Sequence, residues 1–429
     1  MPRSQSKSPP PAARRPLSAR IPWWAVAVTL LVMITAAVTI DPVRDAATLA
    51  SVGEARLSQS ASYIAIAPLS DLLDTITLLS IGQHIAIVLW AIALFAIWRV
   101  NRARRGTSVL RELGAAALML VGIVFVYALA ALLPRPMASL ALSDDTVLAI
   151  DMHSHTKYSH DGRPGWTEDD VRAWHQAAGY DAAYITDHAT FEGAERGIAS
   201  NPRLAGEGTM ILQGLEAFYK GEHVNVLGAG RRYQGLTTAD LKTVDEQSLA
   251  LASLLQATSP VLIETIPGKL DRVPAASDTA PGVRAIEIVD GSPRGLTQGR
   301  RDRARIVRIA DSLDLALVAG SDNHGWGRTA PGWTLMRIPG WRGMTTDSLS
   351  PRIEEILRLG RRGATRVVER RAAPGTNAIQ LVFAAPVAAW TMFAMLSPDE
   401  RVSWILWSWA VVIAIRAWRS ARARRAAPA

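Results

Sequence analysis

The feature that most constrains the fold of this chain is a series of long stretches that contain no charged residue. Four of them, at residues 21–40, 75–98, 113–133 and 372–398, are long enough to cross the hydrocarbon core of a bilayer as helices. A fifth, at residues 402–415, is short for a span and is bounded by arginines, so the sequence leaves open whether it crosses the membrane or lies in its interface. Since 49% of all residues are hydrophobic, we expect a multi-pass membrane protein.

The distribution of arginine predicts the orientation of the chain. Basic residues precede the first stretch and separate the second from the third, so membrane topology explains much of the net charge of +9, and we expect no nucleic-acid partner. By the positive-inside rule both basic clusters are cytoplasmic, which places the region after the third stretch outside. The basic tail prefers the cytoplasm, which it reaches if the fourth stretch spans and the fifth lies in the interface. We therefore expect a protein of the cytoplasmic (inner) membrane with its central domain on the extracytoplasmic side.

These patterns also predict how the chain is divided. The expected parts are a disordered basic arm at 1–20, three transmembrane helices within 21–134, a catalytic domain at 146–372, one or two transmembrane or interfacial helices within 373–418, and a basic tail at 419–429. The chain has no cysteine, so any metal ion must be held by His, Asp or Glu.

The middle of the chain alternates short β-branched runs with helical patterns. The helices are expected at 167–180, 301–313 and 351–363. This alternating order favours a parallel sheet, and about seven or eight strands favour a closed barrel over an open sheet. The expected strands lie at 146–151, 182–186, 210–218, 223–228, 260–267, 285–291, 316–325 and 333–339.

Polar side chains follow four of these strands at the point where each strand ends: His153, His155, Asp187, His188, Glu216, Asp322 and His324. In β/α barrels the C-terminal ends of the strands meet at one face, so we expect these side chains to converge. Six of the eight histidines lie in such strand-end or loop positions. Imidazole and carboxylate are ligands that suit Zn, Mn or Fe. The sequence therefore predicts a multinuclear metal site.

The segments DMHSHTKYSHDG, YITDHAT, GLEAF, EHVNVLG and AGSDNHG, in this order, resemble the polymerase-and-histidinol-phosphatase (PHP) family of metal-dependent hydrolases. The resemblance covers residues 146–341, about half of the chain, and does not extend to the membrane segments. It implies a distorted (β/α)7 barrel that holds two or three divalent metal ions. Together with the apolar stretches, the expected fold is of the α/β class, with the barrel flanked by transmembrane α-helices. EHVNVLG and the late strand TLMRIPG look most like the branch of the family that includes secreted carbamate-type hydrolases as well as phosphoesterase-like proteins.

The resemblance also implies individual ligands. It assigns a first metal to His153, His155, Glu216 and Asp322, a second to Glu216 and His223, and a third to His160, His188 and His324. Where the family usually has a His-Pro pair after the fifth strand, this chain has Ile266 before the proline. Glu264 lies two residues earlier and on an extended strand would face the same side, so it is the candidate replacement ligand.

Metal ions a few ångströms apart lower the pKa of a bound water and polarise a phosphate or carbonyl oxygen, so we expect metal-activated hydroxide as the nucleophile. Asp187 and Asp161 are candidates to orient ligands or carry protons, and ordinary roles as a loop carboxylate or turn former are equally good readings. Lys157, Lys220 and Arg294 are candidates to bind an anionic substrate, or are solvated surface charges.

The leading hypothesis is a membrane-anchored, metal-dependent phosphoesterase that acts on a small molecule or a lipid headgroup. One alternative is a metal-dependent ester, amide or carbamate hydrolase, and another is a non-catalytic membrane receptor with a degenerate metal site, which Ile266 favours. His175, on a predicted helix, is expected at the surface or in packing. His84, in the second apolar stretch, is a functional candidate, although a hydrogen bond to a neighbouring helix explains it equally well.

Overall fold

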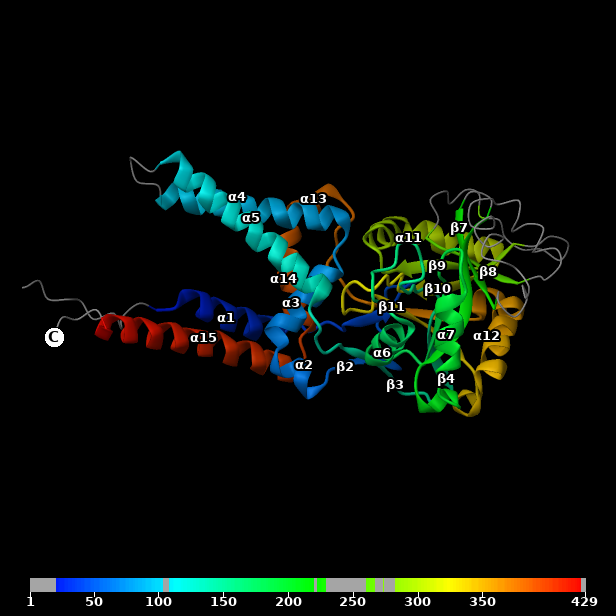
Figure 1. Cartoon of the computed structure of the whole chain (residues 1–429). Coiled ribbons are helices and arrows are strands. Elements are labelled where there is room, and N and C mark those ends of the chain that lie inside the picture. Colours follow the sequence, from blue (N-terminus) through cyan, green and yellow to red (C-terminus); the bar gives the residue numbers. More distant parts are fainter. Residues whose placement is uncertain are drawn as a thin grey trace, which may run out of the picture.

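The computed structural model describes residues 21–102, 108–219, 222–228, 260–266, 273 and 282–425. The predicted basic arm, Lys220 and the last four residues of the predicted tail lie outside the described residues. Figure 1 shows an α/β unit at one end of the molecule and two pairs of helices that extend from it to the other end.

The α/β unit is built on one ten-stranded sheet. Eight of its strands lie at the positions that the sequence predicts: β4 (Val147–Asp151), β5 (Ala182–Ile185), β6 (Met210–Tyr219), β7 (Glu222–Leu227), β8 (Val261–Glu264), β9 (Val283–Asp290), β10 (Ala316–Gly320) and β11 (Gly332–Arg337). Two strands that were not predicted, β1 (Val43–Asp45) and β12 (Arg366–Arg370), extend one edge. The order across the sheet is β1-β12-β11-β4-β5-β6-β7-β8-β9-β10.

The strand directions are mixed, so the expectation of a parallel sheet is only partly met. β4, β5 and β6 are parallel, and so are β8, β9 and β10. Between these two sets β7 is antiparallel to both of its neighbours, and β11, β12 and β1 are also joined by antiparallel pairing. Only two residues separate β6 from β7, whereas a parallel connection needs a dozen or more, so this pair has to be antiparallel.

The sheet curls so that β10 approaches β4 again. The amide of Met152 donates to Ala319 O (3.2 Å), and Ser154 pairs with Asn323 in a parallel bridge. The prediction of an α/β fold with a barrel-like sheet is therefore confirmed in this general form.

Helices cover the outer face and one end of the curled sheet: α6 (Glu168–Ala178), α7 (Glu192–Ala199), α11 (Pro293–Leu313) and α12 (Thr346–Gly360). The apolar side of α11, with Ile306 and Ala310, packs against Val224 and Ile286 on the outer face. Leu349, Ile353 and Leu357 of α12 pack among buried residues near the N-terminal ends of the parallel strands. The C-terminal ends of these strands are left for polar side chains.

Two further strands form in the segment between the first and second apolar stretches, and in the segment between the third stretch and the predicted catalytic domain. β2 (Ala55–Ser58) and β3 (Ser139–Leu142) pair in a small antiparallel sheet. Since β1 lies in the same segment as β2 and joins β12, the segment between the first two helices is part of the α/β unit.

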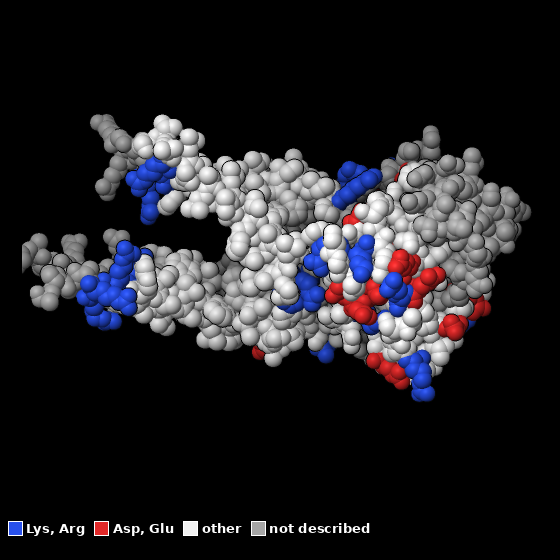
Figure 2. Space-filling model, in the orientation of Figure 1, with Lys and Arg blue, Asp and Glu red and all other residues white. Residues whose placement is uncertain are grey.

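The helix pairs are α4 (Ile81–Arg102) with α5 (Val109–Leu132), and α1 (Trp23–Ala36) with α15 (Pro398–Arg425) (Figure 1). The first pair is joined near both ends, by His84 Nδ1 with Tyr127 OH (2.9 Å) and by Arg99 with Glu112 (2.6 Å). Within the described residues, only α4 and α5 are both long and apolar enough to cross a membrane. Figure 2 shows an open gap between the two pairs.

The fourth predicted span is not one continuous helix. Its residues form α13 (Ala378–Val382) and α14 (Ala384–Met395). The 12 residues of α14 span about 18 Å, whereas the hydrocarbon core of a bilayer is about 30 Å thick. The fifth apolar stretch instead lies within the 28-residue α15, which runs beside α1 (Figure 1).

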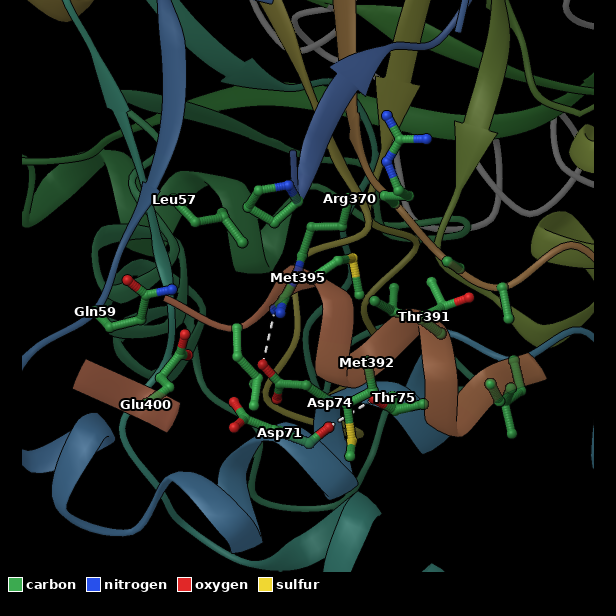
Figure 3. Close-up of a pocket in the computed structure, with 18 of the residues that line it drawn as sticks. Leu57, Gln59, Asp71, Asp74, Thr75, Arg370, Thr391, Met392, Met395 and Glu400 are labelled. Carbon is green, nitrogen blue, oxygen red and sulfur yellow. Dashed lines mark hydrogen bonds and ion pairs between the residues drawn. The ribbon is translucent and has the colours of Figure 1, made fainter. Parts of the chain in front are cut away.

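A buried ion-pair network lies where the helix pairs meet the α/β unit. It is centred on α3 (Ala67–Thr77), which follows the short α2 (Ala61–Ala65). Asp74 accepts hydrogen bonds from Arg135 (2.7 Å) and from Arg370 of β12 (2.8 Å). Figure 3 shows Asp71, Asp74 and Arg370 beside a cavity of about 50 Å³. Because unpaired buried charges are very unfavourable, these pairs hold the helices in one position relative to the sheet.

Candidate metal centre

Glu216 on β6 lies at the centre of a group of histidines. Its Oε2 is 3.1 Å from His153 Nε2, 3.2 Å from His155 Nε2 and 3.1 Å from His188 Nε2. Its Oε1 is 2.8 Å from His223 Nδ1. The histidines reach this point because β4, β5 and β7 end, or in the case of antiparallel β7 begin, beside the C-terminal half of β6.

The loop after β10 supplies a second carboxylate and another histidine. Asp322 Oδ1 lies 3.4 Å from the Nε2 atoms of both His153 and His155, and 3.4 Å from His324 Nδ1. Asp322 has a positive φ of 45°, which is uncommon for a residue with a side chain and often marks a functional position. The amide of Asp322 donates to His153 O (2.9 Å), which fixes the loop against the end of β4.

The structure brings together eight of the nine residues that the sequence proposes as metal ligands: His153, His155, His160, His188, Glu216, His223, Asp322 and His324. His160 lies at the edge, with its ring centroid 4.8 Å from that of His188. Among the described residues, five overlapping groups of three have potential ligand atoms within 4.8 Å of one another. Imidazole nitrogens and carboxylate oxygens at this spacing fit divalent ions such as Zn, Mn or Fe.

The structure does not bring Glu264 to this group. Glu264 is paired with Val224, and Glu216 with Asn225, in the register of the antiparallel strands. Paired residues share a face and successive residues alternate, so Glu264 lies on the face opposite to Glu216. The prediction assumed that the strand continues to Ile266, but β8 ends at Glu264, and Ile266 lines the centre without a ligand atom.

Glu264 is nevertheless an unusual group. It is fully buried, and neither of its carboxyl oxygens has a hydrogen-bond partner in the part of the chain that the structure describes. Burial, with a smaller contribution from Glu222, raises the pKa of Glu264 to about 8.

Sequence reasoning missed Glu287, which lies beside the centre. This residue is fully buried on β9, and its Oε1 is 3.0 Å from His153 Nδ1. A histidine that binds metal through one nitrogen commonly has a carboxylate at the other, which fixes its tautomer and orientation. The only signal in the sequence is a glutamate inside the apolar run AIEIVDG.

His175 is also buried, and its Nε2 is 2.6 Å from Asp151 Oδ2. The other oxygen of Asp151 accepts from the amides of His153 and Ser321. His175 thus has the packing role that the sequence suggests, and it stabilises the start of both ligand loops.

Asp187 and Asp161, which the sequence proposes as groups that orient ligands or carry protons, differ in their surroundings. Asp187 accepts from the amide and the hydroxyl of Thr156, both at 2.6 Å, and burial raises its pKa. Asp161 is partly exposed, accepts from Ser159 Oγ (2.6 Å) and lies 3.0 Å from His324 Nε2. Burial would raise the pKa of Asp161, but the hydrogen bonds from His324 and Ser159 hold it well below its usual range.

The charges of the centre favour a cation. Burial would raise the pKa of Glu216, but the adjoining histidines, His153 foremost, hold it well below its usual range, so the carboxylate is ionised. Burial would lower the pKa of His155, but hydrogen bonds with Asp322 and Glu216 raise it to about 9. Buried carboxylates thus hold positive charge among the imidazoles, and divalent ions would compete with protons for these nitrogens.

The centre opens into a cavity of about 210 Å³. Of the three predicted anion-binding residues, Arg294 in the first turn of α11 lines this cavity. Lys157 is exposed, and its ammonium lies over the ring of Tyr158. Lys220 lies outside the described residues.

No known protein-family model matches the chain. No curated protein matches it significantly. Among solved structures, PsfC from Pseudomonas syringae is 15% identical, with a TM-score of 0.34 over 58% of this chain and 99% of PsfC. A protein from Bifidobacterium adolescentis described as a metal-dependent phosphoesterase is 18% identical, with a TM-score of 0.29 over 48% of this chain and 96% of its own. An amidohydrolase from Chromobacterium violaceum is 16% identical, with a TM-score of 0.28 over 47% and 96%. Similarities at this level carry no conclusion about function.

Proposed function

We propose that the protein is a membrane-anchored, metal-dependent hydrolase of phosphate esters. The observation that carries the proposal is the convergence on Glu216 of four histidines from three separate parts of the chain, with Asp322 beside them. The resemblance of the ligand segments to the PHP family supports the same reading.

The residues present fit two or three divalent ions, with Zn, Mn and Fe as candidates. Glu216 and the four histidines around it would hold such ions, because one oxygen of Glu216 faces three imidazoles and the other faces His223. When bound, such ions supply an activated water and polarise the phosphoryl oxygen. The remaining work falls to the residues of the chain.

Several groups hold the proposed ligands in place. Glu287 fixes the ring of His153, and Asp187 holds Thr156, the residue after His155. Arg294 and the N-terminus of α11 face the cavity, where both favour a phosphate anion.

In the proposed reaction the oxygen of water bonds to phosphorus, the bond from phosphorus to the alcohol oxygen breaks, and a proton passes to that oxygen. That proton is one that the attacking water gives up. Asp161, whose pKa is held well below its usual range, lies at the rim of the cavity 3.0 Å from His324 Nε2, and we assign it to orienting His324.

The membrane part of the proposal rests first on α4 and α5. In each helix only 6% of the most apolar segment is buried, which is unlike the core helix of a soluble protein. Figure 2 shows Lys and Arg at the outer ends of both helix pairs and largely uncharged surface between those ends and the α/β unit. These ends include Arg99 and Arg102 of α4 and the arginines of the last turn of α15.

We therefore propose that both helix pairs cross the cytoplasmic membrane with the arginine-rich ends inside and the metal centre outside. The 14 residues of α1 span only about 21 Å, so in this proposal the uncharged residues 37–40 that follow it complete the crossing. In this arrangement α15, rather than the fourth apolar stretch, returns the chain to the cytoplasm. The basic tail then lies on the side that its charge prefers.

Hydrolysis is tested with the full chain in detergent, stripped of metal and reloaded with Mn or Zn. The substrates are nitrophenyl phosphate mono- and diesters and a matched nitrophenyl carboxylic ester. Phosphate turnover that is lost in His153→Ala with His155→Ala supports the proposal. Turnover of the carboxylic ester alone favours an ester, amide or carbamate hydrolase. Metal binding without any turnover favours the receptor.

Orientation is tested by cysteine labelling, which needs no background removal because the chain has no cysteine. In intact cells an impermeant maleimide should label Ser51→Cys, an exposed position between β1 and β2, and not Arg424→Cys near the end of α15. The reverse pattern would contradict the proposed sidedness.

A further inference from the structure

A second cavity, of about 350 Å³, adjoins the metal centre. It shares Asp161, Ser292, Asp322 and His324 with the cavity described above. Its opposite wall is formed by the ends of the first helix pair, with His84 of α4 and Tyr127, Ala130 and Ala131 of α5. One continuous wall therefore runs from the proposed metal ligands to the two described helices that are long and apolar enough to cross a membrane.

Direct contacts fix this arrangement. The amide of Gly327, in the loop that carries Asp322 and His324, donates to Ala131 O at the end of α5 (2.8 Å). Thr77 Oγ1 donates to Thr329 Oγ1 in the same loop (2.8 Å), and the first amide of α4 donates to Thr297 Oγ1 of α11 (2.9 Å). The helix pair thus packs at the mouth of the centre, and the α/β unit is not attached by a free tether.

The cavity lies at the depth of lipid headgroups if α5 crosses the membrane. The 24 residues of α5 extend for about 36 Å, roughly 6 Å more than the hydrocarbon core. Tyr127 lies five residues before the last residue of α5, about 8 Å along the axis. Each headgroup layer is about 5–8 Å thick, so the wall from Tyr127 to Ala131 spans the boundary between the hydrocarbon core and this layer.

The wall of the cavity is polar on one side and largely apolar on the other. Asp161, Asp322 and His324 lie on the side of the centre, whereas Ala130, Ala131 and the 52%-exposed Trp326 lie towards the helices. An exposed tryptophan is typical of a protein surface that meets the membrane interface. An amphiphile fits such a wall, with its polar head at the centre and its acyl chains between the helix ends.

We infer that the substrate is a membrane lipid with a phosphate in its headgroup, which enters the centre from the adjoining leaflet through this second cavity. The inference rests on the proposed hydrolysis and on the proposed membrane placement. It deepens them by naming the class of substrate.

The first test compares substrates that differ only in their acyl chains. Two matched pairs are assayed with the full-length, Mn-loaded protein. The phosphomonoester pair is dihexanoyl phosphatidic acid and glycerol 3-phosphate. The phosphodiester pair is dihexanoyl phosphatidylglycerol and glycerophosphoglycerol. The acylated member of the hydrolysed pair should have a kcat/KM at least tenfold higher. Equal values, or a preference for the deacylated member, would overturn the inference while leaving nitrophenyl phosphate turnover, and thus the proposed hydrolysis, intact.

A cavity variant localises the effect. Ala131→Trp places a bulky side chain in the shared wall and should lower the ratio of dihexanoyl phosphatidic acid turnover to nitrophenyl phosphate turnover at least tenfold. Leu132→Trp is the control, because Leu132 is the next residue, is 51% exposed and lies outside the cavity wall. An unchanged ratio in a folded Ala131→Trp protein would contradict the inference.

A third measurement does not depend on activity. The metal-stripped full chain is reconstituted in phosphatidylcholine vesicles that contain phosphatidic acid with a diazirine next to its glycerol, irradiated and mapped by mass spectrometry. Labelling should reach the loop around Trp326 as well as α5. Labels confined to the exposed faces of the helices, with none in that loop, would refute lipid entry even if the protein proves not to hydrolyse phosphate.

Discussion

Replacing Glu287 by Gln is expected to weaken metal binding by roughly 10- to 100-fold, whereas the same change at Glu264 should leave it unaltered. The two glutamates are equally buried, with 0% exposure, and lie on the neighbouring strands β9 and β8. Glu287 faces the inside of the curled sheet and contacts His153, and Glu264 faces the outside. Glutamine keeps the side-chain volume and removes the charge. The two variants therefore differ only in whether the altered side chain faces the metal centre or the outside of the sheet.

The magnitude follows from the single contact that Glu287 makes with a proposed ligand. Its Oε1 lies 3.0 Å from His153 Nδ1, and both side chains are almost completely buried. A hydrogen bond to a charged group is worth about 1.5–3 kcal/mol. At about 1.4 kcal/mol per factor of ten, its loss corresponds to a change in affinity of roughly 10- to 100-fold.

The assay is calorimetric titration of Mn or Zn into the metal-stripped full chain in detergent. The number of ions bound should stay the same in both variants, with a weaker dissociation constant only in Glu287→Gln. A loss of one ion in Glu264→Gln would mean that Glu264 is a ligand after all and that the assignment of faces is mistaken. Unchanged affinity in Glu287→Gln would show that the His153 contact does not tune the centre.

Three further predictions concern stability and positioning. The carboxyl of Glu264 has a pKa near 4.5 in the unfolded chain and about 8 in the folded chain, so the free energy of unfolding should fall as pH rises between these values. The loss amounts to roughly 5 kcal/mol. Glu264→Gln should remove it, which denaturation at pH 5 and pH 9 would measure. A Cβ on Gly193 would collide with Asp187 and Thr156, so Gly193→Ala should weaken metal binding several-fold by titration. Asp74→Ala breaks a buried network and should cost about 3–5 kcal/mol, measured as a lower thermal midpoint. Glu355→Ala, which removes an exposed ion pair with Arg352 on α12, should hardly change that midpoint.

Most of the cluster of ligands was predictable because local patterns place these residues at strand ends, whereas His160 and His223 were assigned only from the family resemblance. His153 and Asp322, for example, follow apolar runs, and a curled sheet brings such ends together whatever the directions of the other strands. The side of the sheet on which Glu264 lies was not predictable. Side chains alternate between the two faces only within a strand, and the sequence does not show that β8 ends at Glu264. Glu287 was not predictable either, since its partner lies 134 residues away. Burial in a strand gives no sign of such a distant contact.

The proposed membrane helices show the same limit. Composition locates α4 and α5 because their apolar runs are continuous. The pairing of α15 with α1 is a long-range contact, and the arginines that bound the fifth apolar stretch make α15 a weak signal in a hydropathy argument.

The pairing of β1 with β12 also has a consequence for biogenesis. Arg44 and its partner Glu369 are 325 residues apart, so at 5–20 residues per second the ribosome needs roughly 15–65 s to make the second strand after the first. During this time residues 43–45 have been synthesised, but β12, the strand with which they pair in the folded protein, has not. A strand of three residues with Arg44 at its centre and Asp45 at its end is a poor template for other chains. The segment therefore resists pairing with the wrong strand before β12 is made.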